Sequence, residues 1–432
     1  MSTAHAFEPS IAAGSEVDVG ARWRRLQQDL LTPILQHNRF YRRKMSAIGL
    51  GSPSEIRSIE DFRRLPFTSR DELSRDQVDN PTYGSNLTYG LSAYTRVHQT
   101  SGTTGQPLRW LDTPDSWDWW ARCWGEVYRA AGVGAEDRIF FAFSFGPFIG
   151  FWSAFEGARR IGALAIPGGG MSSYQRLQTI VANRATVLIC TPTYALHLAE
   201  VAEAEGIDIA GSSVRVAIHA GEPGASIPAT RQRIEDAWGC TCFDHVGSTE
   251  VGAWGFETAA RTGVVVNEDE FICEVIDPVT CAPAIEGELV MTNLGRPGMP
   301  VIRYRTGDRV RIAGDPCPWG TPFVRFEGGV IGRTDDAISV RGVNVFPSTI
   351  ENVVRQFPEI AEFAIDVFRR RELDELEITI ELKGGEPEAV AAALTREIQR
   401  QLALRALVKP ATPGALPRFE LKARRVRDHR GS

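Results

Sequence analysis

Two segments hold residues whose types suit polyphosphate and metal binding. TSGTTGQP, residues 100–107, puts hydroxyl side chains and two glycines into one short turn after a plausible strand. Such a turn can point backbone N–H groups and hydroxyls into one concavity, which suits phosphate oxygens, although a loop without a ligand remains the alternative. In DHVGSTEVG, residues 244–252, Glu250 can bind Mg²⁺, which favours few carboxylates plus phosphate oxygens, or can cap a helix.

Two further segments have charged residues in turns. In RYRTGD, residues 303–308, a turn carboxylate at Asp308 can accept both hydroxyls of a ribose or can simply be solvated. IGRTDDAISVRGVNVFPSTIE, residues 331–351, lies where the composition of the chain changes. Its Arg-Thr-Asp-Asp turn therefore suits a hinge between two domains.

The elements that must position these residues are those of an α/β protein. The first 90 residues have helical spacing, and from about residue 97 short apolar runs alternate with helical stretches, which predicts a wound α/β sheet flanked by helices. Consecutive strands, including 271–276, 287–292 and 308–313, predict a β-rich part between 264 and 326, and an α+β module follows. We expect domains at 1–332 and 333–432. The expected strands of the wound sheet are 138–145, 163–167, 186–190 and 214–219.

Composition excludes several classes of function. The chain has 432 residues, 43% of them hydrophobic, and a net charge of −6, which argues against nucleic-acid binding. Residues 139–155 are uncharged, but they are short for the ~20 residues of a bilayer span and contain glycine and proline, so no membrane association is expected. Seven cysteines without a paired framework and no N-terminal targeting segment fit the reducing cytoplasm.

Taken in order, these segments resemble the acyl-adenylate-forming superfamily, and particularly its phenylacetate-coenzyme A ligase branch. The segment 331–351, GEP at 221–223 and the terminal PRFELKARRVRDHR at 417–430 agree with that branch. The resemblance implies a large N-terminal domain and a small mobile C-terminal domain. It also implies that a carboxylate attacks the α-phosphate of Mg-ATP to form an acyl-adenylate and pyrophosphate, after which a thiol displaces AMP.

The resemblance further implies roles for individual residues. Glu250 would hold Mg²⁺, and Lys422 would neutralise charge that builds on the transferring phosphorus, with a solvated lysine as the alternative. Asp335 would be the hinge, because Lys422 and a pantetheine arm cannot occupy the site together. Thr104 joins Glu250 and Lys422 as a catalytic residue. The implied nucleotide-binding residues are Ser101, Gly102, Thr103, Thr104, Gly105, Gly221, Glu222, Pro223, Thr249, Asp308, Arg333 and Asn344.

Aromatic residues supply the expected pocket for the acid. Alternate residues 141, 143 and 145 would share one face of a strand, and a packed core is an equally good reading. The tryptophans at 110, 117, 119, 120 and 124 are expected to pack a helix. The expected pocket residues are Phe141, Phe143, Phe145, Phe148, Gly169, Gly170, His219, His245 and Gly247.

Three positions depart from the superfamily pattern. Val246 replaces an aromatic residue that stacks on adenine, and Gln106 replaces a lysine near the phosphates. Cys317 lacks the nearby thiol partners of a structural zinc site, so no zinc is predicted.

The leading hypothesis is a ligase that uses ATP, Mg²⁺ and coenzyme A to activate an aromatic or arylacetic carboxylate. One alternative passes the acyl group to the phosphopantetheine of a carrier protein. Another, prompted by Val246 and Gln106, is an inactive nucleotide-binding protein. The resemblance suggests a homodimer, and which acid is activated stays open.

Overall fold

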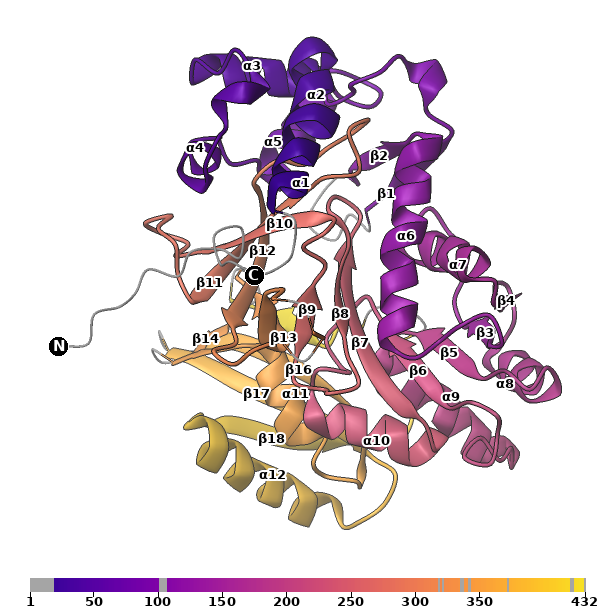
Figure 1. Cartoon of the computed structure of the whole chain (residues 1–432). Coiled ribbons are helices and arrows are strands. Elements are labelled where there is room, and N and C mark those ends of the chain that lie inside the picture. The colour runs from indigo at the N-terminus through magenta and orange to yellow at the C-terminus, as the bar shows by residue number, and fades with distance from the viewer. Residues whose placement is uncertain are drawn as a thin grey trace. The chain divides into compact units, whose positions relative to one another are not determined.

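The computed structural model describes residues 19–100, 107–317, 319–320, 322–334, 338–340, 343–370, 373–419 and 423–430 (Figure 1). The chain divides into two compact units. The first unit comprises residues 1–170 and 245–329, and the second comprises 171–244 and 330–432. This division does not test the boundary expected at residue 332, which stays a prediction.

The first unit begins with a helical segment, as its apolar spacing predicts. Leu26, Leu30, Leu31 and Ile34 are fully buried on one side of consecutive helical turns. Its helices are α1 (Val19–Arg24), the π-helix η1 (Arg25–Leu31), α2 (Thr32–His37), α3 (Arg39–Ala47), the 3₁₀ helix η2 (Pro53–Glu55), α4 (Ile59–Arg63), α5 (Arg70–Asp79), the 3₁₀ helix η3 (Leu91–Ala93), α6 (Pro114–Ala130) and α7 (Ile149–Ile161).

The strands of the first unit are mostly antiparallel. β10, β11 and β12 pair in sequence, β9 pairs with β8 and β13, and β3 and β4 form a parallel pair. The strands are β1 (Arg96–Gln99), β2 (Arg109–Asp112), β3 (Arg138–Phe141), β4 (Leu164–Pro167), β8 (Gly252–Glu257), β9 (Val264–Val266), β10 (Phe271–Ile276), β11 (Glu286–Asn293), β12 (Tyr304–Ile312) and β13 (Arg325–Arg333), whose last residues belong to the second unit.

The second unit combines a parallel strand group with a C-terminal sheet. β6 pairs in parallel with β5 and with the first half of β7. The second half of β7, from His245, belongs to the first unit and pairs with β8. The elements are α8 (Ser173–Ala182), β5 (Val187–Cys190), α9 (Pro192–Glu205), β6 (Val216–His219), α10 (Pro228–Trp238), β7 (Thr241–Ser248), β14 (Ile338–Val340), β15 (Val343–Val345), α11 (Pro347–Val354), β16 (Ile360–Arg370), β17 (Leu373–Leu382), α12 (Pro387–Leu402), β18 (Ala406–Ala411) and β19 (Val426–Asp428).

The C-terminal sheet has the strand order β18-β17-β16-β19, and α12 lies along β18 (Figure 1). Alternate residues of β17 such as Ile378 and Ile380 are fully buried, as their period of two predicts. They join Leu394 and Ile398 of α12 in one apolar core.

Helix α6 is the main packing element of the first unit. The Thr113 side chain accepts a hydrogen bond from the backbone N–H of Ser116 at 3.2 Å and caps the helix, and Pro114 occupies its first turn. The tryptophans expected to pack here are all buried, including Trp110 on β2.

The mixed α/β fold class is confirmed, with a β-rich part and a smaller C-terminal α/β part. One expected strand is too long. The strand expected at 138–145 ends at Phe141, because the following segment turns at Gly146 and Pro147 before α7. Phe143 and Phe145 therefore follow the strand. No helix within the described residues has the length and apolarity that crossing a membrane requires.

Candidate active site

Glu250 lies in the tight connection between β7 and β8 of the first unit. The Ser248 hydroxyl accepts a hydrogen bond from the backbone N–H of Val251 at 3.2 Å, and Ser248 pairs with Gly252 across the hairpin. Gly247 has no room for a side chain, because a Cβ there would lie 2.7 Å from the carbonyl oxygen of Gly252. Glu250 is 6% exposed, so the hairpin holds a carboxylate with little access to water.

Arg70, at the start of α5, pairs with this carboxylate. Its Nη1 donates to Oε1 of Glu250 at 2.9 Å, and its Nη2 donates to the hydroxyl of Thr100 at 3.2 Å. Thr100 is the first residue of the expected phosphate-binding segment 100–107, and its hydroxyl accepts from the backbone N–H of Leu108 just beyond that segment. Arg70 thus joins the Thr249–Glu250 turn to the base of the segment that the sequence assigns to phosphate.

A second arginine, Arg296, holds the backbone of the same turn. Its Nη1 donates to the carbonyl oxygens of Thr249 at 2.6 Å and Glu250 at 3.4 Å. Its other donors form a bidentate pair with Asp112. Burial alone would raise the pKa of the Asp112 carboxyl, but the charges and hydrogen bonds of Arg296 and His98 together outweigh burial and hold that pKa below its usual value.

Asp308, the expected ribose ligand, lies in β12 rather than in a free turn. β11 pairs on either side of it, Glu288 with Arg309 and Val290 with Arg305, and the register shifts in between. Gly307 has a positive φ of 76°, which forms a bulge and leaves Asp308 half-buried. A bulge places its residues outside the regular ladder, and Asp308 lies within this one.

The phenylalanines expected to bind the acid form a ring cluster in the first unit. Phe141 and Phe143 are buried, with ring centroids 5.9 Å apart, which agrees with a packed core. Phe145 and Phe148 are half-buried. A Cβ on Gly169 would lie 3.1 Å from the ring of Phe145, so Gly169 lies against this ring. Gly170 has a positive φ of 76° and open space beside it.

The two candidate histidines are both buried and neutral. In the first unit the His245 ring lies 4.2 Å from the ring of Trp124, and its Nδ1 contacts the carbonyl oxygen of Gly255 at 2.8 Å. In the second unit Nδ1 of His219 lies 3.3 Å from the carbonyl oxygen of Cys190. Burial lowers the pKa of each histidine to about 4. Within the described residues Nε2 of His219 has no hydrogen-bond partner.

Glu222, within the GEP segment of the second unit, connects two other segments of that unit. Its Oε1 accepts from the backbone N–H of Thr193 in the first turn of α9 at 2.9 Å, and its Oε2 accepts from that of Ala423 at 2.7 Å. Burial raises the pKa of this carboxyl. Gly221 has a positive φ of 96°, and Gly221 and Pro223 are exposed.

The remaining candidates are placed in the second unit or lie outside the described residues. Arg333 is exposed at the end of β13, and Asn344 is in β15, paired with Ser339 of β14. The segment 101–106, which includes the five expected phosphate ligands and Gln106, lies outside the described residues, as do Asp335 and Lys422.

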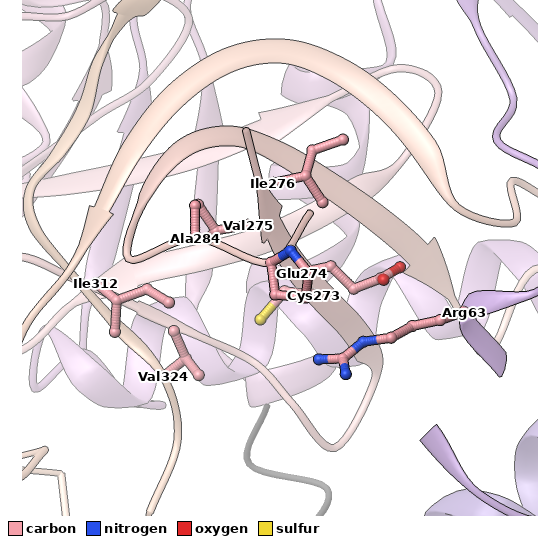
Figure 2. Close-up of a pocket in the computed structure, with 9 residues that line it drawn as sticks. Arg63, Cys273, Glu274, Val275, Ile276, Ala284, Ile312 and Val324 are labelled. Atoms are coloured by element: carbon pink, nitrogen blue, oxygen red, sulfur yellow. The ribbon is translucent and has the colours of Figure 1, made fainter. Parts of the chain in front are cut away.

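Two cavities in the structure involve none of these candidates. One of about 20 Å³, with room for about one water molecule, lies beside β10 and is lined by residues such as Cys273, Ile276 and Val324 (Figure 2). The other, of about 500 Å³, is in the second unit beside α9 and α10 and includes Arg233 and Arg355.

The donors at the Thr249–Glu250 turn fit Mg²⁺ that arrives with a nucleotide. The described residues contain no cluster of three or more metal-binding side chains that would form a cage by itself. Glu250 offers one buried carboxylate, which pairs with the partly exposed guanidinium of Arg70. One carboxylate plus substrate phosphates is the coordination that Mg²⁺ prefers.

Comparison with known proteins shows the family of the chain. Residues 342–430 match the family described as AMP-binding enzyme C-terminal domain. The phenylacetate-coenzyme A ligase of Escherichia coli (strain K12) is 34% identical over 405 residues, which cover 90% of each chain. The chain belongs to the phenylacetate-coenzyme A ligase family. It is therefore an AMP-forming acyl-coenzyme A ligase, as the resemblance in its motifs predicts.

Solved structures of this ligase class agree over nearly the whole chain. A crystal structure of 2-hydroxyisobutyryl-CoA ligase in the postadenylation state, in complex with R3-HIB-AMP, has a TM-score of 0.90 at 30% identity and covers 95% of this chain and 90% of that one. The same enzyme with 2-HIB-AMP and CoA in its thioesterification state has a TM-score of 0.71 at 31% identity, with 95% and 89% covered. Those complexes contain the acyl-adenylate and the thiol of the two half-reactions.

Sequence reasoning missed the arginines around the family's Ser-Thr-Glu segment. Arg70 follows the helix cap Ser69, and Arg296 stands in a Gly/Pro-rich turn. Neither belongs to a recognisable motif, and their partners are 180 and 47 residues away in the chain. Only the three-dimensional pairing reveals them.

Proposed function

We propose that this ligase activates an aryl or arylacetic acid with Mg-ATP and transfers the acyl group to coenzyme A. The observation that carries the nucleotide part is the bridge of Arg70 between Glu250 and Thr100. It brings a carboxylate and a guanidinium to the base of the segment assigned to phosphate. A metal bound there would shield phosphate charge during attack on the α-phosphorus.

Different residues are proposed to bind different parts of the nucleotide. Glu250 and Thr249 bind the metal and phosphate end, together with Ser101, Gly102, Thr103, Thr104 and Gly105. Asp308 binds the ribose hydroxyls, and Arg333 lies near the ribose or a phosphate. The adenine is lined by Gly221, Glu222 and Pro223, and Asn344 is a further nucleotide-binding residue. The half-buried position of Asp308 at a bulge supports its assignment, because ribose hydroxyls need an accessible acceptor.

Lys422 and Asp335 complete the proposed cycle. The Lys422 ammonium neutralises charge on the transferring phosphorus during adenylation, and rotation about Asp335 then clears the site for the thiol. Support comes from the hydrogen bond between Glu222 and the N–H of Ala423, which ties the segment after Lys422 to a proposed nucleotide-binding residue.

The acid is proposed to lie against the half-buried rings of Phe145 and Phe148. Aromatic rings favour offset-stacked or edge-to-face partners, which suits an aryl group. Gly169 lets its backbone approach Phe145 closely. His219 is proposed to hydrogen-bond a polar ring substituent through its Nε2, which has no hydrogen-bond partner among the residues that the structure describes. His245, Gly170 and Gly247 are proposed to complete the pocket. The E. coli relative's name refers to phenylacetate, which belongs to this class of acid.

The substrate is tested by measuring acyl-coenzyme A formation with a panel of acids under identical ATP and Mg²⁺. Phenylacetate, benzoate and hydroxylated phenylacetates are compared with 2-hydroxyisobutyrate and short fatty acids. We expect the highest kcat/KM with an aryl or arylacetic acid. Preference for 2-hydroxyisobutyrate by tenfold or more would contradict the aryl proposal and leave the ligase activity standing.

The acceptor and the cellular setting are tested separately. We propose free coenzyme A as acceptor, and transfer to a purified carrier protein without transfer to coenzyme A would contradict this. We also propose a cytoplasmic homodimer. No disulfide joins any of the seven cysteines, all of which the structure describes, and this agrees with a reducing compartment. Sedimentation of the purified chain in an analytical ultracentrifuge would measure the dimer directly.

A further inference from the structure

We propose that Arg296 is a positioning residue that fixes the Thr249–Glu250 turn through its backbone and so sets the place of the Glu250 carboxylate. The inference rests on the proposed role of Glu250 in binding Mg-ATP. It assigns a function to a buried ion pair that lies outside every motif of the sequence.

The guanidinium of Arg296 uses its planar fork on two partners at once. Nε and Nη2 donate to the two carboxylate oxygens of Asp112, each at 2.7 Å. Nη1 remains for the turn and donates to the carbonyl oxygen of Thr249 at 2.6 Å and, more weakly, to that of Glu250 at 3.4 Å. A lysine cannot reproduce this, because its single ammonium lacks the rigid fork.

The surroundings hold Arg296 in one orientation. Its guanidinium lies 5.4 Å from the ring centroids of both Trp110 and Trp120, within cation–π range. Asp112 and Arg296 are both fully buried. An ion pair with no solvent exposure costs desolvation free energy, so a role in specifying geometry is a reasonable explanation for its presence.

Two further side chains bind neighbouring groups of the turn. The side-chain amide of Asn293 donates to the carbonyl oxygen of Val251 at 2.9 Å. Arg70 holds the Glu250 carboxylate itself at 2.9 Å. Of these contacts, the Arg296 hydrogen bond to Thr249 is the shortest, and it comes from a side chain that cannot move without breaking its bidentate pair with Asp112.

The test uses the full chain with Arg296→Lys, and follows two readouts. Pyrophosphate exchange is measured across Mg²⁺ concentrations, and calorimetry measures ATP binding with Mg²⁺ and with EDTA. We expect Arg296→Lys to raise the half-saturating Mg²⁺ concentration about tenfold and to lower the exchange rate at least tenfold, because small misplacements of catalytic groups cost that much or more. ATP binding in EDTA should change little.

Arg325→Lys is the matched control. Arg325 is also buried in the first unit, and it donates to the carbonyl oxygen of Thr262 and to the Asp315 carboxylate, but it does not contact the turn. We expect this variant to lose thermal stability and to keep the Mg²⁺ dependence of the wild type. An equal shift in both variants would overturn the proposal, since it would then reflect general loosening.

Asp112→Asn is a second variant that tests the inference if Arg296→Lys does not fold. It leaves every hydrogen bond from Arg296 to the turn possible but weakens the pair that orients the guanidinium. We expect a smaller shift of the Mg²⁺ midpoint, about threefold, and no additional shift when it is combined with Arg296→Lys. A folded Arg296→Lys or Asp112→Asn enzyme with the wild-type midpoint overturns the inference. Failure of the proposed function can be told apart from failure of this inference. In that case the wild-type enzyme itself would show neither pyrophosphate exchange nor Mg²⁺-dependent ATP binding.

Discussion

At the scale of residues, Glu250 combines burial with an ion pair to Arg70. Its carboxylate is 6% exposed and pairs with Arg70 at 2.9 Å. If Glu250 holds Mg²⁺ as proposed, its carboxylate would face the metal and the Arg70 guanidinium would be left to pair with phosphate oxygens. Arg70 was not predicted from the sequence, because the helix cap that precedes it explains its local pattern completely.

Glu250→Gln tests the metal assignment. The amide keeps the shape but loses the charge that attracts Mg²⁺, so we expect pyrophosphate exchange to fall about 100-fold. Thioester formation from supplied acyl-adenylate should fall much less, because in that half-reaction AMP leaves and no triphosphate or pyrophosphate is involved. Glu286→Gln, which removes another arginine-paired carboxylate at Arg309, is the control. Equal losses in both half-reactions would contradict the assignment.

The β7–β8 hairpin positions the turn at the scale of elements. Gly252 has a φ of 130°, and a Cβ there would lie 2.6 Å from the indole of Trp119 and 2.9 Å from Phe271. The hairpin thus packs directly against α6 and β10. The tryptophans of α6, predicted as packing residues, therefore support the active site indirectly.

Gly252→Ala is expected to destabilise the fold by about 3 kcal/mol, because the side chain meets both an unfavourable φ and a filled core. Urea unfolding measures the change. Gly134→Ala is the matched control, since Gly134 has nothing within 4 Å of its Cβ position and should change the free energy of unfolding by less than about 1 kcal/mol. Similar losses in the two variants would show that packing at Gly252 is unimportant.

A second element-scale contact joins the GEP segment to the chain before β19. In Glu222→Gln an amide NH₂ group takes the place of one carboxylate oxygen. One of the two backbone N–H groups that Glu222 accepts from, that of Thr193 or that of Ala423, then loses its acceptor. We expect trypsin to cleave after Lys422 or Arg424 several-fold faster, because local opening becomes easier. Glu388→Gln, at the exposed start of α12, is the control. Unchanged cleavage would mean that Glu222 does not hold this segment.

At the scale of the whole molecule, the sequence predicted the α/β class, the β-rich part and the C-terminal module, since these depend on periodicity. The strand Phe271–Ile276 has the expected bounds. The sequence could not predict that β3 ends at Phe141, because the run of apolar residues continues beyond the strand into the loop before α7. Burial of His219 and pairing of Arg296 depend on neighbours distant in sequence, which local patterns do not encode.

The two buried histidines predict how global stability depends on pH. Burial lowers their pKa to about 4, below the ordinary 6.5, so the unfolded chain binds protons that the folded chain does not bind between these values. The free energy of unfolding should therefore fall as pH drops from 6.5 toward 4, by up to about 3 kcal/mol per histidine.

Urea unfolding at pH 5 and pH 7 measures this dependence. His219→Gln and His245→Gln should each be less stable than the wild type at pH 7 but should lose less stability on acidification. A variant whose loss between pH 7 and pH 5 equals that of the wild type would contradict the neutral, buried state of that histidine.

The central claim is that the chain forms an aryl-adenylate from ATP, and acid-dependent exchange of labelled pyrophosphate into ATP measures that step alone. We predict exchange that requires Mg²⁺ and an aryl or arylacetic acid and that persists without coenzyme A. Absence of exchange with every such acid, in a folded enzyme that also shows no heat of ATP binding, would contradict it.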